Sequence, residues 1–422
     1  MTILINVNVD WIKLNTQPVD RLTTAAAAAR LGVKRETLYA YVSRGLLHRV
    51  VAEDGRSSLF DAGEIEELAS RRTGRTKREV RAAVSTSLSR VADDGLWIRG
   101  QSLAELASRG LDYEVVADLL WDSPKGEDWT GSQEPVHSGL VHSEPADSSR
   151  QPMIAGDAPL LDHLRVAVAL ASAGDPLRHD RSPKAVRASG RGLINRMAES
   201  LPERSRSAAG GHRLADRVWS RLARRKGQRA ERDALNMAMV LLIDHGLAPS
   251  TYAARVAASV RCDPYSVALT GLGVVGGPLH GASSASVHRM LEAAAGPSGA
   301  AAAVGEVIKN LDSPPGFGHS VYSVQDHRYG PLMAALMSAW GRDPRLSVIQ
   351  ETRDVISSRT DALANVDLAL GSLTYLAGMH ADAGEVIFAI SRTAGWLAHA
   401  MEEYDEQPLR FRPRASYIGP TA

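Results

Sequence analysis

Residues 271–284 read GLGVVGGPLHGASS, and this glycine-rich stretch holds a histidine at position 280. The pair Gly276–Gly277 precedes His280, and Gly281 follows it. Glycine allows a backbone to approach a ligand closely, and glycines near the start of a helix leave free N–H groups that favour anions. A single histidine is more often a packed or surface side chain than a catalyst, but this setting favours contact with a ligand. An ordinary loop histidine is the alternative.

Two further histidines stand in turn-rich sequence. His319 ends the run PPGFGH at 314–319, and His245 lies in IDHGLAPST at 243–251. The glycines before His319 give it the same setting as His280, so the same two interpretations apply to it.

An aspartate interrupts the apolar run ALANVDLALGSL at residues 362–373. Burying Asp367 as an anion would be costly. Desolvation would raise the pKa of its carboxyl group and make it a competent general base. The alternative is an exposed or helix-capping aspartate, which these residues alone favour.

The composition of the whole chain favours a mainly helical protein. Its 422 residues are enough for two or three domains. Lys and Arg number 49 against 48 Asp and Glu, so the net charge of +1 requires no nucleic-acid or membrane partner. Aromatic residues make up only 5% and alanine is plentiful, which suits close-packed helices.

Cysteine usage and targeting signals predict a soluble cytoplasmic protein. The single cysteine, Cys262, excludes an internal disulfide framework and a cysteine-based zinc cluster. The start MTILINVNVDWIKL lacks the features of a signal peptide, and no uncharged apolar stretch reaches about 18 residues. No zinc-ligand spacing, Walker A loop or G-x-S-x-G elbow supports a metalloenzyme, an NTPase or a serine hydrolase.

The first part of the chain has the pattern of a helix-turn-helix. Thr23 and Thr24 are good N-caps for the short helix AAAAAR, and Gly32 follows where a tight turn needs positive φ. KRETLYAYVSRGLL at 34–47 then predicts a second helix, closed by Gly45. Five side chains of this helix belong to types that contact phosphates and base edges: Lys34, Arg35, Thr37, Tyr41 and Arg44.

The segment after this helix completes the resemblance to a known DNA-binding type. VVAEDGRSSLFDAGEIEELASRR at 50–72 predicts a hairpin with a turn at Asp54-Gly55, followed by another helix. With AARLGVKRETLYAYVSRGLL at 28–47, it resembles the winged helix-turn-helix of the MerR and excisionase type. Residues 1–81 carry 14 basic and 10 acidic side chains, and a surplus of +4 is small for DNA affinity. DNA binding, a protein-contact module and a relic therefore stay open.

Seven segments, in order along the chain, resemble the signature segments of the citrate synthase family. They are LWIRGQSLAELASRGLDYEVVADLLW (96–121), IDHGLAPSTYAARVAAS (243–259), GLGVVGGPLHGASS (271–284), GFGHSVYSVQDHRYGPLM (316–333), NVDLALGSL (365–373), SRTAGWLAHAMEE (391–403) and RFRPRASYIG (410–419). The likeness runs from about residue 82 to 419. Only residues 122–156 do not match; they are rich in Ser, Pro, Gly, Asp and Glu and predict a long loop or disordered insert.

The resemblance implies a mainly α fold with a large and a small helical domain, preceded by the small winged helix-turn-helix. The expected helix-turn-helix domain spans residues 1–75. The large domain would comprise 82–280 and 391–422, and the small domain 281–390, with the active site between them. Closure of the domains would exclude water until condensation is complete.

The family roles carry over onto matching positions. Asp367 would remove a proton from the acyl-CoA, His280 would stabilise the enol, and His319 would polarise and protonate the ketone of oxaloacetate. The implied ligands of the oxo acid are His245, Arg328, Arg392 and Arg412. The loop around CoA would be Pro314, Pro315, Gly316, Phe317 and Gly318. The resemblance also implies a homodimer in which Arg412 reaches the neighbouring subunit's site, no metal, and no cofactor besides the acyl-CoA co-substrate.

Several positions depart from the family pattern: Ser284, Ser320, His327, Leu368, Ala369 and Leu370. The last three replace a Phe-Tyr-Ser sequence, and smaller or aliphatic groups beside the base would enlarge the acyl pocket and admit propionyl-CoA, or mark a slow or redirected enzyme. Three functions therefore stay open. They are a citrate synthase, a 2-methylcitrate synthase or related condensing enzyme, and a DNA-binding regulator that uses the fold as a metabolite sensor.

Overall fold

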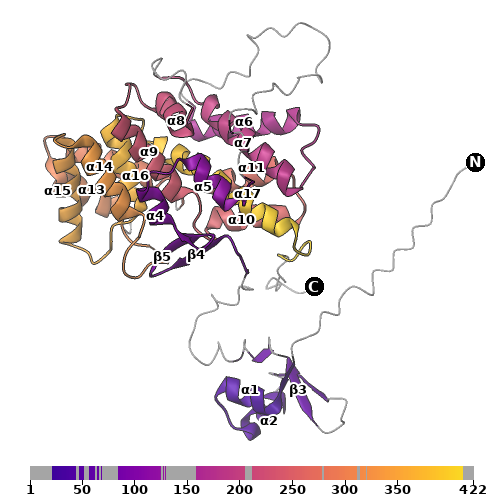
Figure 1. Cartoon of the computed structure of the whole chain (residues 1–422). Helices are drawn as coiled ribbons and strands as arrows, with labels where there is room; N and C mark the ends of the chain where they lie inside the picture. The colour runs from indigo at the N-terminus through magenta and orange to yellow at the C-terminus, as the bar shows by residue number, and fades with distance from the viewer. Residues whose placement is uncertain are drawn as a thin grey trace, which may run out of the picture. The chain divides into compact units, whose positions relative to one another are not determined.

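A computed structural model divides the chain into two units, Met1–Ser85 and Thr86–Ala422, which are described separately (Figure 1). The residues that the structure describes are 21–43, 47–51, 57–61, 64–65, 68, 84–124, 127, 129, 158–204, 212–277, 280–310, 314–319 and 321–411. Among them, no helix is long and apolar enough to cross a membrane.

The N-terminal unit confirms the predicted helix-turn-helix. Helices α1 (Thr24–Leu31) and α2 (Arg35–Ser43) are joined at Gly32, whose φ of +61° is the left-handed conformation that glycine adopts without strain. The Thr23 hydroxyl caps α1 by accepting a hydrogen bond from the backbone N–H of Ala26 at 3.3 Å. The α2 helix is shorter than the predicted span of 34–47, and Gly45 and Arg44 lie outside the described residues.

A three-stranded antiparallel sheet packs with these two helices. Strands β2 (Arg49–Val51) and β3 (Ser58–Asp61) form the predicted hairpin, although the turn at 54–55 lies outside the described residues. Strand β1 (Arg21–Thr23) pairs with the other edge of β3, and the sequence did not predict it because three residues are too short to show alternation. The core of the unit comprises Ala27, Ala28, Leu31, Leu38, Leu47, Phe60, Ile65 and Leu68.

The C-terminal unit begins with a small sheet and continues as helices. Its antiparallel strands are β4 (Ser89–Ala92), β5 (Gly95–Ile98) and β6 (Gln101–Ser102). The helices that follow are α4 (Leu103–Ser108), α5 (Tyr113–Leu120), α6 (Leu160–Gly174), α7 (Pro183–Ser200), α8 (Leu214–Leu222), α9 (Arg229–Leu242), α10 (Pro249–Ser259) and α11 (Pro264–Val275). The remaining helices are α12 (Ser283–Ala294), α13 (Gly299–Asn310), α14 (Tyr329–Trp340), α15 (Arg345–Ser357), α16 (Val366–Ala377) and α17 (Ala383–Tyr404).

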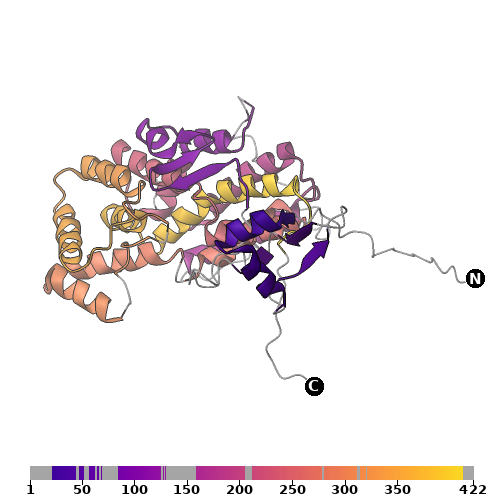
Figure 2. The same ribbon diagram turned by 90° about the horizontal axis from the view of Figure 1, so that it is seen from below.

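Helix α17 is the central element of this unit. It packs against α6, α7, α9, α10 and α11, and Figure 2 shows it in yellow running through the body. Most of its side chains are buried, because alanine and glycine let neighbouring helices approach closely. Helices α12 to α16 pack on one another at one end of the unit, coloured orange in Figure 1. The proposed domain boundary at 390/391 falls inside α17, which is continuous there.

Trp129, near the start of the predicted insert at 122–156, packs against the helical body of the C-terminal unit. The Trp129 indole stacks on Trp121 with ring centroids 5.7 Å apart, and its Nε1–H donates to the Asp118 carboxylate at 3.0 Å. Arg191 also pairs with Asp118 at 2.6 Å, so this corner is tied to α5 and α7. Residues 125–126, 128 and 130–156 lie outside the described part of the chain.

The packing of α11 on α17 leads to a stability prediction. A Cβ atom added at Gly271 would lie 2.5 Å from the buried Trp396 ring, so Gly271→Ala should lower the free energy of unfolding by about 1–3 kcal/mol through overpacking. Gly305→Ala is the matched control, because a Cβ there meets nothing within 4 Å and alanine favours helix by up to about 1 kcal/mol. Urea unfolding measures both; equal effects of the two substitutions would contradict the described packing.

Candidate active site

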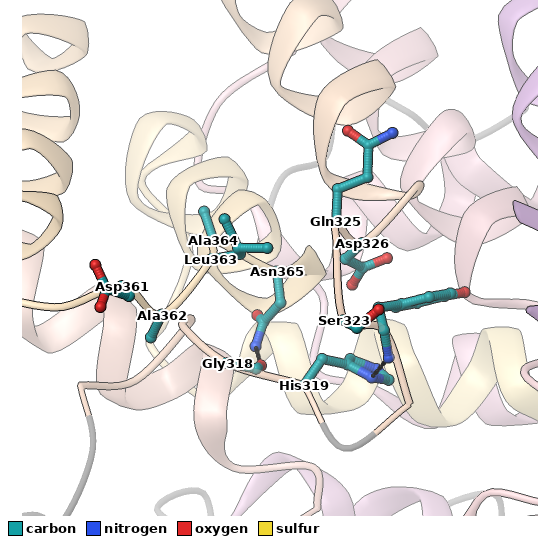
Figure 3. Close-up of a pocket in the computed structure, with 11 residues that line it drawn as sticks. Gly318, His319, Ser323, Gln325, Asp326, Asp361, Ala362, Leu363, Ala364 and Asn365 are labelled. Atoms are coloured by element: carbon teal, nitrogen blue, oxygen red, sulfur yellow. Dashed lines mark hydrogen bonds between the residues drawn. The ribbon is translucent and has the colours of Figure 1, made fainter. Parts of the chain in front are cut away.

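The predicted site residues come from distant parts of the sequence. Arg392 is close enough to shift the pKa values of His245, His280 and Asp367. A pocket of about 200 Å³ opens beside His319, between the loop after Gly318 and the segment before α16 (Figure 3). Its lining residues are Gly318, His319, Tyr322, Ser323, Gln325, Asp326, Asp361, Ala362, Leu363, Ala364 and Asn365. Of the predicted site residues that the structure describes, only Gly318 and His319 line this pocket.

The Nδ1 atom of His319 is hydrogen-bonded to the backbone of the residues that follow it. Its Nδ1 accepts hydrogen bonds from the backbone N–H groups of Val321 at 3.0 Å and Tyr322 at 3.3 Å. Two N–H donors on Nδ1 put the proton of the neutral ring on Nε2, which lies 3.4 Å from Nη2 of Arg328. Burial and the nearby Arg328 guanidinium lower the pKa of His319, so the ring is neutral around pH 7.

The imidazole ring of His245 packs against the ring of His319. The two ring centroids are 5.2 Å apart, and the His245 Nε2 is 2.9 Å from the Tyr322 hydroxyl. Burial, then the positive charges of Arg328 and Arg392, lower the pKa of His245 well below its ordinary value. A neutral imidazole can donate to or accept from a bound oxygen atom without adding charge to the site.

His280 contacts one aromatic side chain, Phe388, and one serine, Ser250. Its Nε2 is 2.8 Å from the Ser250 hydroxyl, which also accepts from the Trp396 indole N–H at 3.2 Å. Ser250 can donate its own proton to Nε2, and in that arrangement the ring proton of His280 is on Nδ1. Burial, then Arg392, lower the pKa of His280 to about 4.

The glycines around His280 serve the packing of the protein itself. A Cβ on Gly281 would lie 2.4 Å from the backbone oxygen of Val275, and one on Gly276 would lie 2.3 Å from the Arg165 guanidinium. The expectation that these glycines leave room for a ligand is therefore not supported at these two positions; they allow close contact with α11 and α6.

Asp367 lies in the first turn of α16. Asn365 is the N-cap of this helix, and its side-chain oxygen accepts from the Asp367 backbone N–H at 2.9 Å. Burial raises the pKa of Asp367 to about 6, while Arg328 and a hydrogen bond from Ser283 oppose that shift. The carboxylate is thus a stronger base than an exposed aspartate.

Arg328 is held by a carboxylate that the sequence reading missed. Its Nε and Nη2 donate to the two oxygens of Asp326 at 2.9 and 2.8 Å, and both residues are buried. Asp326 Oδ2 also accepts from the backbone N–H of Val366 at 2.8 Å, at the start of α16. One carboxylate therefore joins the arginine to the helix that carries Asp367. An acid two residues before the arginine, in QDHR, was the available signal.

Arg392 is buried with most of its hydrogen-bonding capacity unused. Its side chain is 1% exposed, its Nε donates to the backbone oxygen of Leu242 at 2.7 Å, and it lies over the Phe388 ring. Within the described residues, Nη1 and Nη2 have no hydrogen-bond partner. Burial lowers the pKa of Arg392 to about 10, so the group stays charged near neutral pH. A buried, charged fork with free donors fits a carboxylate ligand.

The remaining predicted residues are distributed as follows. Arg412 and Ser320 lie outside the described residues. Gly316 and Gly318 have φ near +78°, and a Cβ on Gly316 would lie 2.9 Å from the Leu368 backbone, so glycine is required there. Pro315 and Phe317 are buried in the same turn, and Pro314 is partly exposed.

The departures from the family pattern have ordinary structural settings. Leu368, Ala369 and Leu370 are at most 1% exposed and belong to the main hydrophobic core, so their packing does not support the predicted enlargement of an acyl pocket. Ser284 is also buried. The His327 Nε2 lies 2.8 Å from the backbone oxygen of Asp93, which links the segment after His319 to the β4–β5 turn.

No cluster of three or more His, Cys, Asp or Glu side chains able to hold a metal ion occurs in the part of the chain that the structure describes.

Comparison with known families matches both units. Residues 78–414 match the citrate synthase C-terminal domain, and residues 21–73 match a helix-turn-helix domain. The first match covers most of the chain, so the chain belongs to the citrate synthase family, whose members are acyl-transferring enzymes.

Individual relatives agree with this assignment. Citrate synthase 2 of Bacillus subtilis is 29% identical over 355 residues, covering 80% of this chain and 94% of the relative. 2-Methylcitrate synthase 1 of Corynebacterium glutamicum is 28% identical over 364 residues, covering 79% and 92%. A citrate synthase of Thermoplasma acidophilum, solved with carboxymethyl coenzyme A and oxaloacetate, has the same fold with a TM-score of 0.64 at 22% identity, covering 82% of this chain and 95% of that one.

Proposed function

We propose that this chain condenses acetyl-CoA with oxaloacetate to give citrate and CoA. The observation that carries the proposal is the buried Arg392 guanidinium, with two donor nitrogens unpaired in the described residues, in a site that also holds Asp367 and the neutral histidines. An anionic substrate would complete its hydrogen bonds.

The first chemical step is removal of a proton from the acyl-CoA methyl group. A thioester α-proton is too weakly acidic for a free carboxylate, so the base needs a donor aimed at the developing oxyanion. Asp367, with its pKa raised to about 6, is the proposed base. His280 is the proposed donor, through Nδ1–H, because its Nε2 is held by Ser250.

The second step is attack of the enol on the ketone of the oxo acid. His319 is the proposed donor to that ketone through Nε2–H, since Nδ1 accepts from backbone N–H groups. The ketone oxygen would bind beside Nη2 of Arg328, which lies 3.4 Å from Nε2. Arg328 and Arg392 are the proposed carboxylate ligands, with His245 beside them, because a planar guanidinium binds carboxylates bidentately. Hydrolysis of the resulting thioester then releases CoA.

A 2-methylcitrate synthase is the nearest alternative within the same chemistry. Relatives of both names match this chain at similar identity. Because Leu368, Ala369 and Leu370 lie in the core, they do not argue for propionyl-CoA over acetyl-CoA.

Several further assignments belong to this proposal. The enzyme would work in the cytoplasm without a prosthetic group, and the turn at 314–318 would contact CoA. Large and small domains at 82–280 with 391–422 and at 281–390 would close around the substrates. A homodimer would supply Arg412 from the partner.

Mutation of the proposed base or oxyanion donor tests the catalytic assignment. Asp367→Ala and His280→Ala should each lower kcat at least about a hundredfold, because one oxyanion donor is typically worth about 3 kcal/mol. Free-thiol release with oxaloacetate and either acetyl-CoA or propionyl-CoA is the measurement, and it also gives the acyl preference. Asp354→Ala and His212→Ala, at exposed positions, are the controls. Near-wild-type turnover in either site variant would refute the assignment.

The raised pKa of Asp367 predicts an acid limb in the pH profile. The base acts only when deprotonated, so kcat/KM should be level above pH 7 and fall about tenfold per pH unit below about 6. The pKa values of the three histidines are lowered from the ordinary value, which moves their own protonation to lower pH. A profile that stays level down to pH 5 would show that Asp367 is not the base.

A contact with DNA is a second candidate function, carried by the N-terminal unit. Lys34 and Arg35 are exposed at the start of α2, the helix that enters the major groove in helix-turn-helix proteins. A regulator without catalysis is not favoured, because the chain belongs to an enzyme family.

Binding to a duplex selected from a random 30-base-pair library tests this candidate. If Lys34 and Arg35 contact phosphates, a double alanine variant should bind more weakly and reduce the slope of log K against log salt by about two, because each phosphate contact releases a counterion. Fluorescence anisotropy at several salt concentrations measures both quantities, with Arg353→Ala in the other unit as control. Absence of binding at 50 mM salt would reject the candidate.

A further inference from the structure

One buried amide joins the two halves of the proposed site. Asn365 is 8% exposed and lies at the start of α16. Its side-chain oxygen accepts from the backbone N–H of Asp367 at 2.9 Å. Its side-chain nitrogen donates to the backbone oxygen of Gly318 at 2.7 Å, as Figure 3 shows. The amide oxygen therefore bonds to the proposed base Asp367, and the amide nitrogen bonds to Gly318, the residue before His319.

The backbone around this amide adds to the connection. The backbone N–H of Asn365 donates to Gly316 at 2.9 Å, and that of Gly318 donates to Leu363 at 2.8 Å. The turn before His319 and the segment before Asp367 therefore run side by side, with an isolated bridge between Phe317 and Ala364. The side-chain bond of Asn365 is the contact nearest to His319 in this series.

The residue type suits this position. The amide oxygen alone would cap the helix, and serine, threonine or aspartate would do that equally well. Only an amide of this length also presents an N–H donor to a carbonyl on the opposite segment. The hydrogen bond to Gly318, rather than the capping of α16, therefore requires asparagine at this position.

We propose that Asn365 is a positioning residue that sets the base Asp367 in register with His319, so that the enol forms within reach of the ketone. The inference rests on the proposed condensation, because it assigns Asp367 to the acyl-CoA and His319 to the oxo acid. Asn365 itself contacts neither substrate. A displacement of about 1 Å between reacting groups lowers rates by up to about a hundredfold.

Substitutions at Asn365 separate the two contacts. Asn365→Ser keeps a capping oxygen but does not reach Gly318, and Asn365→Ala removes both contacts. The expected result for Asn365→Ser is a kcat lowered about 10- to 100-fold with the KM for acyl-CoA within about twofold of wild type. Asn365→Ala should show the same kcat defect together with a lower unfolding midpoint.

Asn236 provides a matched control. It is also buried, and its amide accepts from the backbone N–H of Tyr113 at 3.0 Å and donates to the backbone oxygen of Leu111 at 2.8 Å, neither of which is a proposed site residue. Asn236→Ser should lower the unfolding midpoint while leaving kcat per folded molecule unchanged. Equal loss of kcat in Asn236→Ser and Asn365→Ser would show a general structural effect and overturn the inference.

A readout independent of turnover completes the test. Hydrogen exchange in a peptide covering 314–322 should be up to about tenfold faster in Asn365→Ser, because the turn loses one hydrogen bond. If the Ser variant does not fold, the nearly isosteric Asn365→Asp, which lacks the donor, takes its place in both measurements.

The outcomes distinguish the two proposals. Wild-type protein that releases no thiol refutes the proposed function, and the exchange data then decide whether Asn365 holds the turn. An active wild type with kcat in Asn365→Ser within twofold of it overturns the inference alone.

Discussion

The buried guanidinium of Arg392 is the feature around which the catalytic unit is arranged. Burying a charged group with unpaired donors is costly, and the surrounding protein offsets only part of that cost. The Nε bond to Leu242 and the nearby Asp244 carboxylate stabilise the group, while its two terminal nitrogens keep no partner in the described residues. Helix α17 carries this arginine through the centre of the unit, so its packing fixes where an anion would bind.

The second half of the site depends on short segments rather than on one helix. Asp326 holds Arg328 and the first N–H of α16, and Asn365 holds the turn before His319. These contacts connect an arginine, a base and a histidine that lie far apart in the sequence. Since each contact is between buried or half-buried groups, loss of one partner leaves the other unsatisfied. The site therefore has little freedom to rearrange one residue at a time.

Local signals were enough to predict the N-terminal unit. Thr23 and Gly32 have specific conformational roles, and the structure confirms both. The family resemblance identified His280, His319 and Asp367 as candidates, and the family match over residues 78–414 confirms the family. Local glycine patterns were less informative, because Gly276 and Gly281 turn out to accommodate Arg165 and Val275 rather than a ligand.

The residues that the sequence did not indicate act through long-range contacts. Ser250 and Asn365 have no distinctive spacing, and their roles appear only when the chain brings their partners close. The sequence also did not predict that Leu368, Ala369 and Leu370 lie in the core, because residues beside a base can face either the site or the interior. Such facts depend on tertiary packing, which local pattern does not encode.

Direct measurement of oxaloacetate binding tests the central claim, that Arg392 is kept unpaired for a substrate carboxylate. Titration calorimetry on wild type and on Arg392→Met, without acyl-CoA, isolates this step from catalysis. Loss of a charge-assisted hydrogen-bonded pair should weaken binding about 10- to 100-fold, while thermal unfolding confirms that the variant is folded. Oxaloacetate that binds the folded Arg392→Met variant as tightly as it binds wild type would contradict the account.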